Sequence, residues 1–345
     1  MRTIFYGTPA LAVPFLDLLV RKSAVVGVLT SPDKPVGRSL RVQPTPVKAR
    51  AVESGLKVLQ PERPTAAVAE LLELRPDLAV AVAYGQLIPP DLLGVPALGS
   101  LNVHFSLLPQ YRGAAPVQWS LVRGESRTGV TVFWIAEGLD TGPIFLQRGL
   151  DIGPNEDAEG LFSRLVALGL EVLEQTLDEL AAGCVRREPQ IGEPSLAPRL
   201  KKEDGRISFS RGARDLHNLV RGLRQWPTAF FELRAPSPAV RKSGRPAPAE
   251  LSIPQASRRV RVLKTALSGS PMTANTFPEG RQGGAAPAAP GTIARVERGG
   301  GILVQCLDCS SLWLLTVQPE GKKPVAAADF LNGLRLGVGD VLSLA

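Results

Sequence analysis

The chain has 345 residues, of which 44% are hydrophobic and 21% charged, and it contains three cysteines. That length suggests about two domains, and the composition can fill their cores, which excludes a disordered chain and a disulfide-stapled mini-protein. No apolar run approaches the ~20 residues of a membrane helix, and residues 1–7 resemble a strand more than a signal peptide. We therefore expect a soluble, cytoplasmic protein.

The positive charge is concentrated in the C-terminal part of the chain. Lys and Arg number 40 against 32 Asp and Glu, and residues 206–345 alone hold 19 basic and 9 acidic side chains. A basic region favours a polyanionic partner such as nucleic acid, because neutralising phosphates releases counterions. A cationic surface that only keeps the protein soluble fits the charge equally well.

The first half alternates short apolar runs with amphipathic segments. Strands are predicted at 2–6, 24–29, 57–59, 78–82, 100–104, 129–135 and 143–148. Helices are predicted at 9–22, 46–54, 65–74 and 157–181, and residues 30–45 form a long polar loop. Nearly continuous apolar strands separated by helices are typical of a mostly parallel sheet covered on both faces.

The second half has a different pattern. The polar segment 183–205, with three prolines, is interpreted as a linker, and a helix is predicted at 211–224. Short strands follow at 228–234, 259–266, 291–297, 301–307 and 311–317, which indicates a small β-barrel. Residues 235–258 and 268–290 are rich in Pro, Ala and Gly and are expected to be flexible loops of that barrel.

Three residues form the strongest candidate site. His104, one of only two histidines, ends a predicted strand, and ligands of open α/β sheets bind at such strand ends. Asn102 precedes it by two positions and so faces the same side, while Asp140 lies in a loop between two glycines. Asn and protonated His can donate hydrogen bonds to a developing oxyanion, and Asp can orient the imidazole. The trio therefore suits acyl transfer to an amine.

Other interpretations of these residues stay open. A lone histidine is more often structural, and Asp-Thr-Gly is a common turn. The sequence contains no nucleophile elbow, dinucleotide fingerprint or Walker lysine motif. Cys306 and Cys309 lack further ligands for zinc and are interpreted as small core residues of a strand, and His217 as structural.

Several ordered segments carry a family resemblance. They are 2–9, 30–38, 44–48, 83–89, 102–116, 138–142, 197–207, 226–227, 321–324 and 328–331. Together they resemble the folate-dependent formyltransferases, and within that group the family that acts on methionyl-tRNA. The likeness covers nearly the whole chain except 235–258 and 268–290, which look like insertions.

The resemblance implies a domain organisation. Residues 1–188 would form a Rossmann-like formyltransferase domain with a mostly parallel sheet, and 189–206 a linker. Residues 207–345 would form an OB-like, basic, tRNA-binding β-barrel that carries the two insertions.

The resemblance also implies a reaction and roles for residues. The formyl group of 10-formyltetrahydrofolate would pass, without a metal, to the α-amino group of methionyl-initiator tRNA, with Asn102, His104 and Asp140 as catalytic residues. The folate site would comprise Tyr84, Gly85, Gln86, Leu87, Ser106, Leu107, Leu108, Pro109 and Leu139. The tRNA would contact Lys34, Arg38, Arg41, Lys322 and Lys323. Nothing in the sequence demands more than a monomer.

Four rival functions share parts of this pattern. Formyltransferases that act on a glycinamide ribonucleotide or on an amino-sugar nucleotide, and a hydrolase that releases formate, would use the same catalytic half. The basic barrel and the loop bearing Arg38 argue against all three. The intact trio argues against a non-catalytic RNA-binding protein built on a dead enzyme fold.

Overall fold

The computed structural model describes the chain except residues 37–40, 234–257, 269–287, 299, 335 and 343–345. Two compact units are formed. The first comprises residues 1–117, 126–152 and 160–199, and the second comprises 118–125, 153–159 and 200–345. Arg38 and nearly all of the two expected insertions lie outside the described residues.

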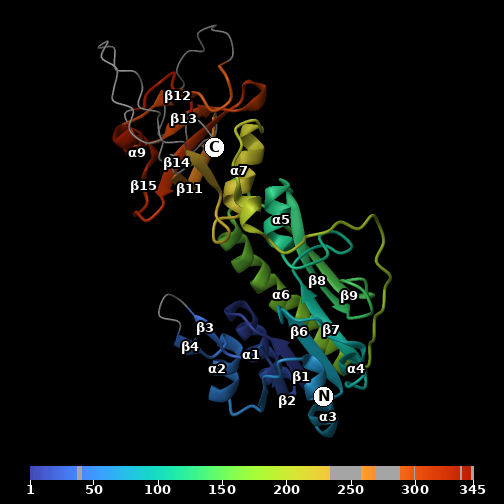
Figure 1. Ribbon diagram of the computed structural model, residues 1–345. Coiled ribbons are helices and arrows are strands. Elements are labelled where there is room, and N and C mark those ends of the chain that lie inside the picture. Colours follow the sequence, from blue (N-terminus) through green and yellow to red (C-terminus); the bar gives the residue numbers. More distant parts are fainter. Residues whose placement is uncertain (37–40, 234–257, 269–287, 299, 335, 343–345) are drawn as a thin grey trace, which may run out of the picture. The chain divides into compact units, whose positions relative to one another are not determined.

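A seven-stranded sheet in the order β5-β2-β1-β6-β7-β8-β9 forms the centre of the first unit (Figure 1). The strands are β1 (Arg2–Gly7), β2 (Ala24–Leu29), β5 (Val58–Leu59), β6 (Leu78–Val82), β7 (Gly99–His104), β8 (Arg127–Trp134) and β9 (Ile144–Asp151). The five strands from β5 to β7 pair in parallel, whereas β8 and β9 are antiparallel. The mostly parallel, Rossmann-like sheet is confirmed. Because parallel strands point the same way, the loops after β1, β2, β6 and β7 all leave from one edge.

Helices connect these strands largely where the apolar periodicity predicts them. They are α1 (Val13–Lys22), α2 (Pro46–Glu53), α3 (Val68–Glu73), α4 (Pro90–Leu93), α5 (Pro116–Val122) and α6 (Ala158–Ala181), with 3₁₀ turns η1 (Ala10–Ala12) and η2 (Pro64–Ala67). In α2 the Thr45 hydroxyl caps the first turn by accepting from the Lys48 amide, 3.1 Å away. In α6 leucines at helical spacing form a buried face, which includes Leu161, Leu165 and Leu173. Neither α4 nor α5 was predicted, because segments of four and seven residues are too short to show a helical period.

The segment 30–45 is not a continuous loop. A short antiparallel hairpin forms within it from β3 (Lys34–Val36) and β4 (Arg41–Gln43). Three-residue strands are too short to show the alternation by which strands are recognised in a sequence.

The second unit is an antiparallel, OB-like sheet in the order β10-β11-β14-β13-β12, with β15 paired to β14. Its strands are β10 (Phe230–Leu233), β11 (Arg258–Leu267), β12 (Ile293–Val296), β13 (Ile302–Gln305), β14 (Ser311–Pro319) and β15 (Val325–Ala326). Its helical elements are η3 (Lys202–Gly205), α7 (Ala213–Gly222), η4 (Leu307–Cys309) and α9 (Ala327–Leu334). Helix α7 packs against β11 and β14. None of the described helices is long and apolar enough to cross a membrane.

Candidate active site

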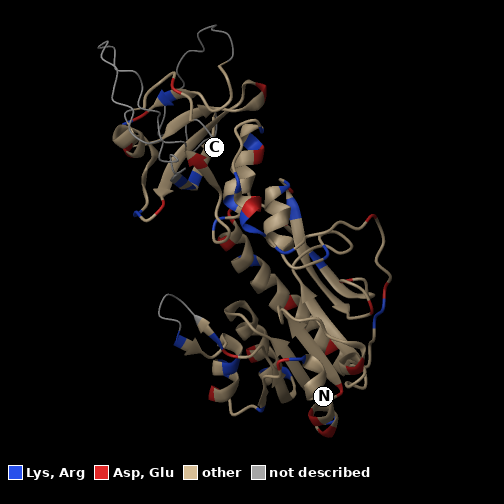
Figure 2. Ribbon diagram, viewed as in Figure 1, with Lys and Arg blue, Asp and Glu red and all other residues tan. Residues whose placement is uncertain are grey.

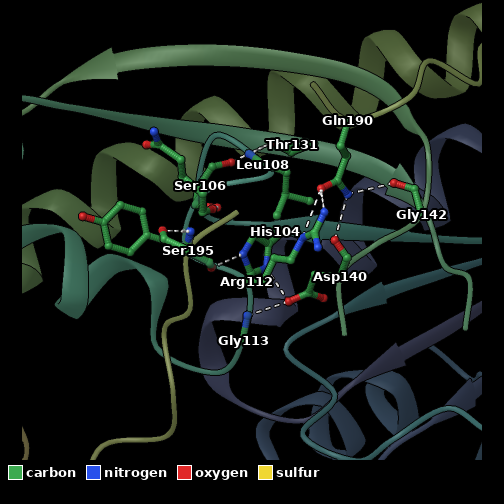
Figure 3. Close-up of polar contacts among 12 residues, drawn as sticks. His104, Ser106, Leu108, Arg112, Gly113, Thr131, Asp140, Gly142, Gln190 and Ser195 are labelled. Carbon is green, nitrogen blue, oxygen red and sulfur yellow. Dashed lines mark hydrogen bonds and ion pairs between the residues drawn. The ribbon is translucent and has the colours of Figure 1, made fainter. Parts of the chain in front are cut away.

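His104 is buried at the C-terminal end of β7, with 5% of its surface exposed. Its Nε2 lies 2.9 Å from the carbonyl oxygen of Tyr111. A carbonyl can only accept a hydrogen bond, so Nε2 must carry the proton that it donates. The neutral ring is therefore the Nε2–H tautomer, and Nδ1 is the nitrogen left for chemistry. Nδ1 faces the carboxylate of Asp140, with 3.7 Å between Nδ1 and Oδ2 (Figure 3).

Asp140 lies in the loop between β8 and β9, at a positive φ of 52°. Its Oδ2 also accepts a hydrogen bond of 2.7 Å from the backbone amide of Gly113. Gly113 has a φ of 125°, and a Cβ there would lie 2.6 Å from the carbonyl oxygen of Ala197. Only glycine fits this position, so its amide is held where it can anchor the carboxylate.

Asn102 occupies the middle of β7, between Ala81 of β6 and Phe133 of β8. It is half-buried. Strand alternation places its side chain on the same face as that of His104. Among the described residues none forms a hydrogen bond with the Asn102 side chain, so its amide is available to a ligand.

The segment after His104 is held by hydrogen bonds within the protein. The Ser106 hydroxyl donates to the Gln110 carbonyl at 2.6 Å. The hydroxyl of Thr131 donates to the Ser106 carbonyl at 2.7 Å and accepts from the Leu108 amide at 3.2 Å. A cis peptide bond joins Leu108 to Pro109. The backbone of this predicted folate-site segment is thus fixed from β8.

Leu107, the remaining member of that segment, is half-buried and lies against Gly129 of β8. A Cβ at Gly129 would come within 2.5 Å of the Leu107 side chain. The absence of a side chain on β8 therefore makes room for Leu107 beside the site.

The loop after β6 supplies the other part of the predicted folate site. Tyr84 is buried against Tyr6, with ring centroids 5.9 Å apart, and burial raises the pKa of Tyr84 to about 12. Within the described structure both phenol hydroxyls are buried without a hydrogen-bond partner. Gly85 adopts a φ of 83°, and the Gln86 amide lies 3.4 Å from the Ser31 hydroxyl.

Two leucines predicted for the folate site are unusually exposed. Leu87, after β6, is 83% exposed, and Leu139, beside Asp140, is 56% exposed. Exposed apolar side chains on loops at a ligand-binding edge fit a flat, partly apolar ring system, which would cover them. The residues present are therefore compatible with a folate.

The residues predicted to contact tRNA lie in both units. Lys34 and Arg41 are exposed and belong to β3 and β4. Figure 2 shows basic positions along the ribbon of both units. Lys322 and Lys323 are exposed in the turn between β14 and β15. Arg38 lies outside the described residues.

Asp33 fixes the base of the β3–β4 hairpin. Its carboxylate forms an ion pair with Lys48 and accepts a hydrogen bond of 2.7 Å from the Gln60 amide. The hydrogen bond from Lys48, followed by that from Gln60, holds the pKa of the Asp33 carboxyl below its usual range. Gln60 also donates to the Ser31 carbonyl at 2.9 Å, so the hairpin is tied to the strand edge.

The two cysteines near the C-terminus differ from each other. Cys306 is buried, and burial raises the pKa of its thiol to about 11. Cys309 is exposed in η4, and Cys306 follows the end of β13 at Gln305. The interpretation of both as core residues of a strand is therefore correct only for the burial of Cys306 and is wrong for Cys309. The chain reverses at Asp308 and Cys309, both at a φ of 57°, and this turns Cys309 towards solvent. Nowhere in the described ranges do three or more His, Cys, Asp or Glu gather in a way that could hold a metal.

Three polar residues that the sequence did not single out for a role lie in the His104–Asp140 network. Arg112, Gln190 and Ser195 link the loops on either side of it (Figure 3). Gln190 and Ser195 come from the segment interpreted as a linker, about 80 positions beyond their partners in 111–112. No periodicity or motif connects residues so far apart.

Known protein families and curated relatives match this chain over nearly its whole length. Residues 2–177 match the formyl transferase family, and residues 199–335 match the formyl transferase C-terminal domain. The methionyl-tRNA formyltransferase of Elusimicrobium minutum is 38% identical over 99% of both chains. That of Solibacter usitatus is 42% identical over 97% of this chain and 96% of its own.

Solved structures show the same fold at greater distance. An N-formyltransferase from Helicobacter canadensis, in complex with folinic acid and dTDP-3-aminofucose, superposes with a TM-score of 0.61 at 17% identity. The match covers 91% of this chain and 98% of that one. The full-length likeness to the curated relatives is closer and more specific. The chain belongs to the methionyl-tRNA formyltransferase family.

Proposed function

We propose that this enzyme transfers the formyl group of 10-formyltetrahydrofolate to the α-amino group of methionyl-initiator tRNA, with Asn102, His104 and Asp140 as its catalytic residues. The observation that carries the residue assignment is the state of His104. Its Nε2 is occupied by the Tyr111 carbonyl, and its Nδ1 faces Asp140 at 3.7 Å. A buried histidine held in one tautomer with its other nitrogen next to a carboxylate is arranged for proton chemistry.

We assign 10-formyltetrahydrofolate as the formyl donor from the family match and from the residues that lie at the C-terminal edge of the parallel strands. When bound, 10-formyltetrahydrofolate supplies an activated formyl group. Leu87 and Leu139 offer exposed apolar surface to its ring system, and hydrogen bonds within the protein fix the backbone of Ser106 to Pro109. The Helicobacter canadensis N-formyltransferase, which shares the fold, is in complex with folinic acid, and this supports a folate as the donor.

In this mechanism Asn102 and His104 stabilise the negative charge that develops on the formyl oxygen. The Asn102 amide donates one hydrogen bond, and Nδ1–H of the protonated His104 ring donates a second. The amine nitrogen attacks the formyl carbon, and Asp140, which stabilises the charge on His104, accepts through an ordered water the proton that the amine loses. When the tetrahedral intermediate collapses, the bond between the formyl carbon and N10 of the donor breaks, the same relay returns the proton to N10, and tetrahydrofolate leaves. Hydrogen-bond donors meet the developing charge, so the proposal needs no metal.

The acceptor is recognised mainly through its phosphates. Lys34, Arg38 and Arg41 contact the acceptor end of the tRNA, and Lys322 and Lys323 contact its backbone from the second unit. Lysine and arginine contacts of this kind position a nucleic acid without reading its sequence. We also propose that the enzyme acts as a monomer in the cytoplasm.

The test of the reaction compares acceptors under one set of conditions. Formyl transfer from 10-formyltetrahydrofolate is measured with methionyl-initiator tRNA, methionyl-elongator tRNA and free methionine. Rapid transfer to the initiator alone is expected. Equal transfer to both tRNAs would overturn the assignment of the initiator. Transfer to neither tRNA, by a folded preparation that binds folate, would leave the catalytic half in place with another acceptor.

The role of Lys322 and Lys323 is tested by salt dependence. The Michaelis constant for tRNA should rise steeply with salt, and Lys322→Ala with Lys323→Ala should reduce the slope of its logarithm by about 1 for each phosphate that the enzyme no longer neutralises. Lys57→Ala is the matched control, because Lys57 is already paired with Glu70 at 2.7 Å. If the double variant and the control have the same slope, the two lysines do not bind tRNA.

A further inference from the structure

The segment that follows α6 is hydrogen-bonded to two loops beside the catalytic residues. One is the loop after β7, and the other is the loop between β8 and β9, which contains Asp140. We define residues 188–197 as the strap. At its start, Glu188 and Ile144 exchange backbone hydrogen bonds of 2.7 and 2.9 Å beside the Asp140 loop. At its end, the Ser195 carbonyl accepts from the Arg112 amide at 2.8 Å, and the Ala197 amide donates to the Arg112 carbonyl at 2.7 Å. The strap is thus attached to the chain on both sides of the candidate site.

Gln190 is the strap side chain that reaches the Asp140 loop. Its amide nitrogen donates to the carbonyl oxygens of Asp140 and Gly142, at 2.8 and 2.9 Å (Figure 3). Its amide oxygen accepts two hydrogen bonds from the Arg112 guanidinium, at 2.6 and 3.2 Å. Both hydrogens of the amide nitrogen and both lone pairs of the amide oxygen are therefore used.

The opposite end of the strap fixes the partner loop. The Ser195 hydroxyl accepts a hydrogen bond of 2.9 Å from the Tyr111 amide. The Tyr111 carbonyl in turn accepts the hydrogen bond from Nε2 of His104. Two residues further along the chain, the Gly113 amide donates to the Asp140 carboxylate. Both members of the His104–Asp140 pair are thus held by loops that the strap connects.

We propose that Gln190 is a positioning residue that sets the distance between Asp140 and His104, using Arg112 as its own anchor. The inference rests on the catalytic role proposed for Asp140. Asp140 has a positive φ, which a non-glycine residue adopts at a cost, so its loop needs an external restraint. The two hydrogen bonds from the Gln190 amide, on either side of Thr141, supply that restraint.

The structure distinguishes a positioning role from a merely structural one. In Gln190→Glu the introduced carboxylate still accepts from Arg112, so the strap stays anchored. It has no proton to donate to the Asp140 and Gly142 carbonyls, so the loop is released. A strap that only stabilises the fold would tolerate this change, whereas a positioning residue would not.

The experiment measures kcat and both Michaelis constants for Gln190→Glu, Gln190→Ala and Ile191→Ala. Ile191 is the matched control because it is the next strap residue and is 84% exposed. We expect both Gln190 variants to lose about 10- to 100-fold in kcat with little change in either Michaelis constant, as a small misplacement does. The control should keep the wild-type rate. A Gln190→Glu enzyme with wild-type kcat would refute the proposal.

A readout that is independent of activity accompanies the kinetics. Hydrogen exchange of the Gly113 amide, which donates to Asp140, should be faster in both Gln190 variants and unchanged in Ile191→Ala. Unchanged exchange in the Gln190 variants would contradict the proposal. Because Gln190→Glu retains its partner Arg112, its melting temperature reports whether the fold itself survives.

A double variant separates this inference from the proposed function. If Gln190 acts through Asp140, adding Gln190→Glu to Asp140→Asn should slow the enzyme no further. Additive losses would show that Gln190 acts elsewhere. A near-normal rate in Asp140→Asn alone would remove the catalytic role of Asp140. A slow Asp140→Asn enzyme beside a normal Gln190→Glu enzyme would refute only the role of Gln190.

Discussion

Protonation of a buried histidine should make the second unit sensitive to mild acid. His217, on α7, is 4% exposed, and its Nδ1 lies 2.9 Å from the hydroxyl of Thr265 on β11. Burial, reinforced by the nearby positive charges of Arg221 and Arg214, lowers the pKa of His217 to about 4. The ring is therefore neutral in the folded protein at neutral pH.

The magnitude follows from linkage between protonation and folding. In the unfolded chain a histidine has a pKa of about 6.5. Between pH 6.5 and about pH 4 the unfolded state therefore binds a proton at His217, whereas the folded state does not. Stability is fully present above the unfolded pKa and falls as the pH drops through this window. Relative to neutral pH, protonation of His217 alone should lower the free energy of unfolding by about 2 kcal/mol at pH 5 and by about 3 kcal/mol near pH 3.

The assay is urea unfolding at pH 7.5 and pH 5.0, followed by tryptophan fluorescence. His217→Asn keeps a hydrogen-bonding group near Thr265 but cannot titrate, so it should reduce the difference in unfolding free energy between the two pH values by about 2 kcal/mol. Because the chain has two histidines, comparing the variant with the wild type also assigns the ring resonance of His217 for a direct titration by NMR. A variant that loses as much stability at pH 5.0 as the wild type would refute this account.

Further predictions concern catalysis and packing. Asn102→Ala and His104→Ala should each lower kcat by about 10²- to 10³-fold, as loss of one oxyanion donor does, and a near-normal rate in either would remove its assignment. Asp140→Asn should lose rate while folate binding, measured by titration calorimetry, stays largely intact; collapse of binding would make its role structural. Gly142→Ala should cost about 1–3 kcal/mol or more of stability, because its Cβ would lie 1.7 Å from a backbone carbonyl oxygen. Gly333→Ala, in a helix with open space around it, is the control, and calorimetric melting should show no loss there.

The arrangement of the strands was largely accessible from local sequence. Buried parallel strands such as Leu78–Val82 are short apolar runs, and the strand–helix alternation around them predicts the mostly parallel sheet. The exceptions have local causes. Helix α5 begins at Pro116, straight after a Pro- and Gly-rich stretch, and the β3–β4 hairpin has strands of three residues. In both places the periodic signal is absent or too short to read.

Local sequence is enough to identify the residue types that could perform the chemistry and to place two of them on one face. Asn102 and His104 are two positions apart on one strand, so alternation alone places them together. The proximity of His104 to Asp140 required the tertiary structure, because it depends on how the loop between β8 and β9 approaches the end of β7. The folded chain also decided which imidazole nitrogen is free, since the carbonyl of Tyr111 occupies the other.

The strap is the part of the site that depends most on tertiary contacts. Its Pro-containing, polar sequence has the composition of a linker, because side chains that bind backbone carbonyls leave no hydrophobic pattern. Gln190 meets Asp140 across 50 positions and Arg112 across 78. Interactions of that range depend on the packing of the whole unit, and no local preference of the chain encodes them.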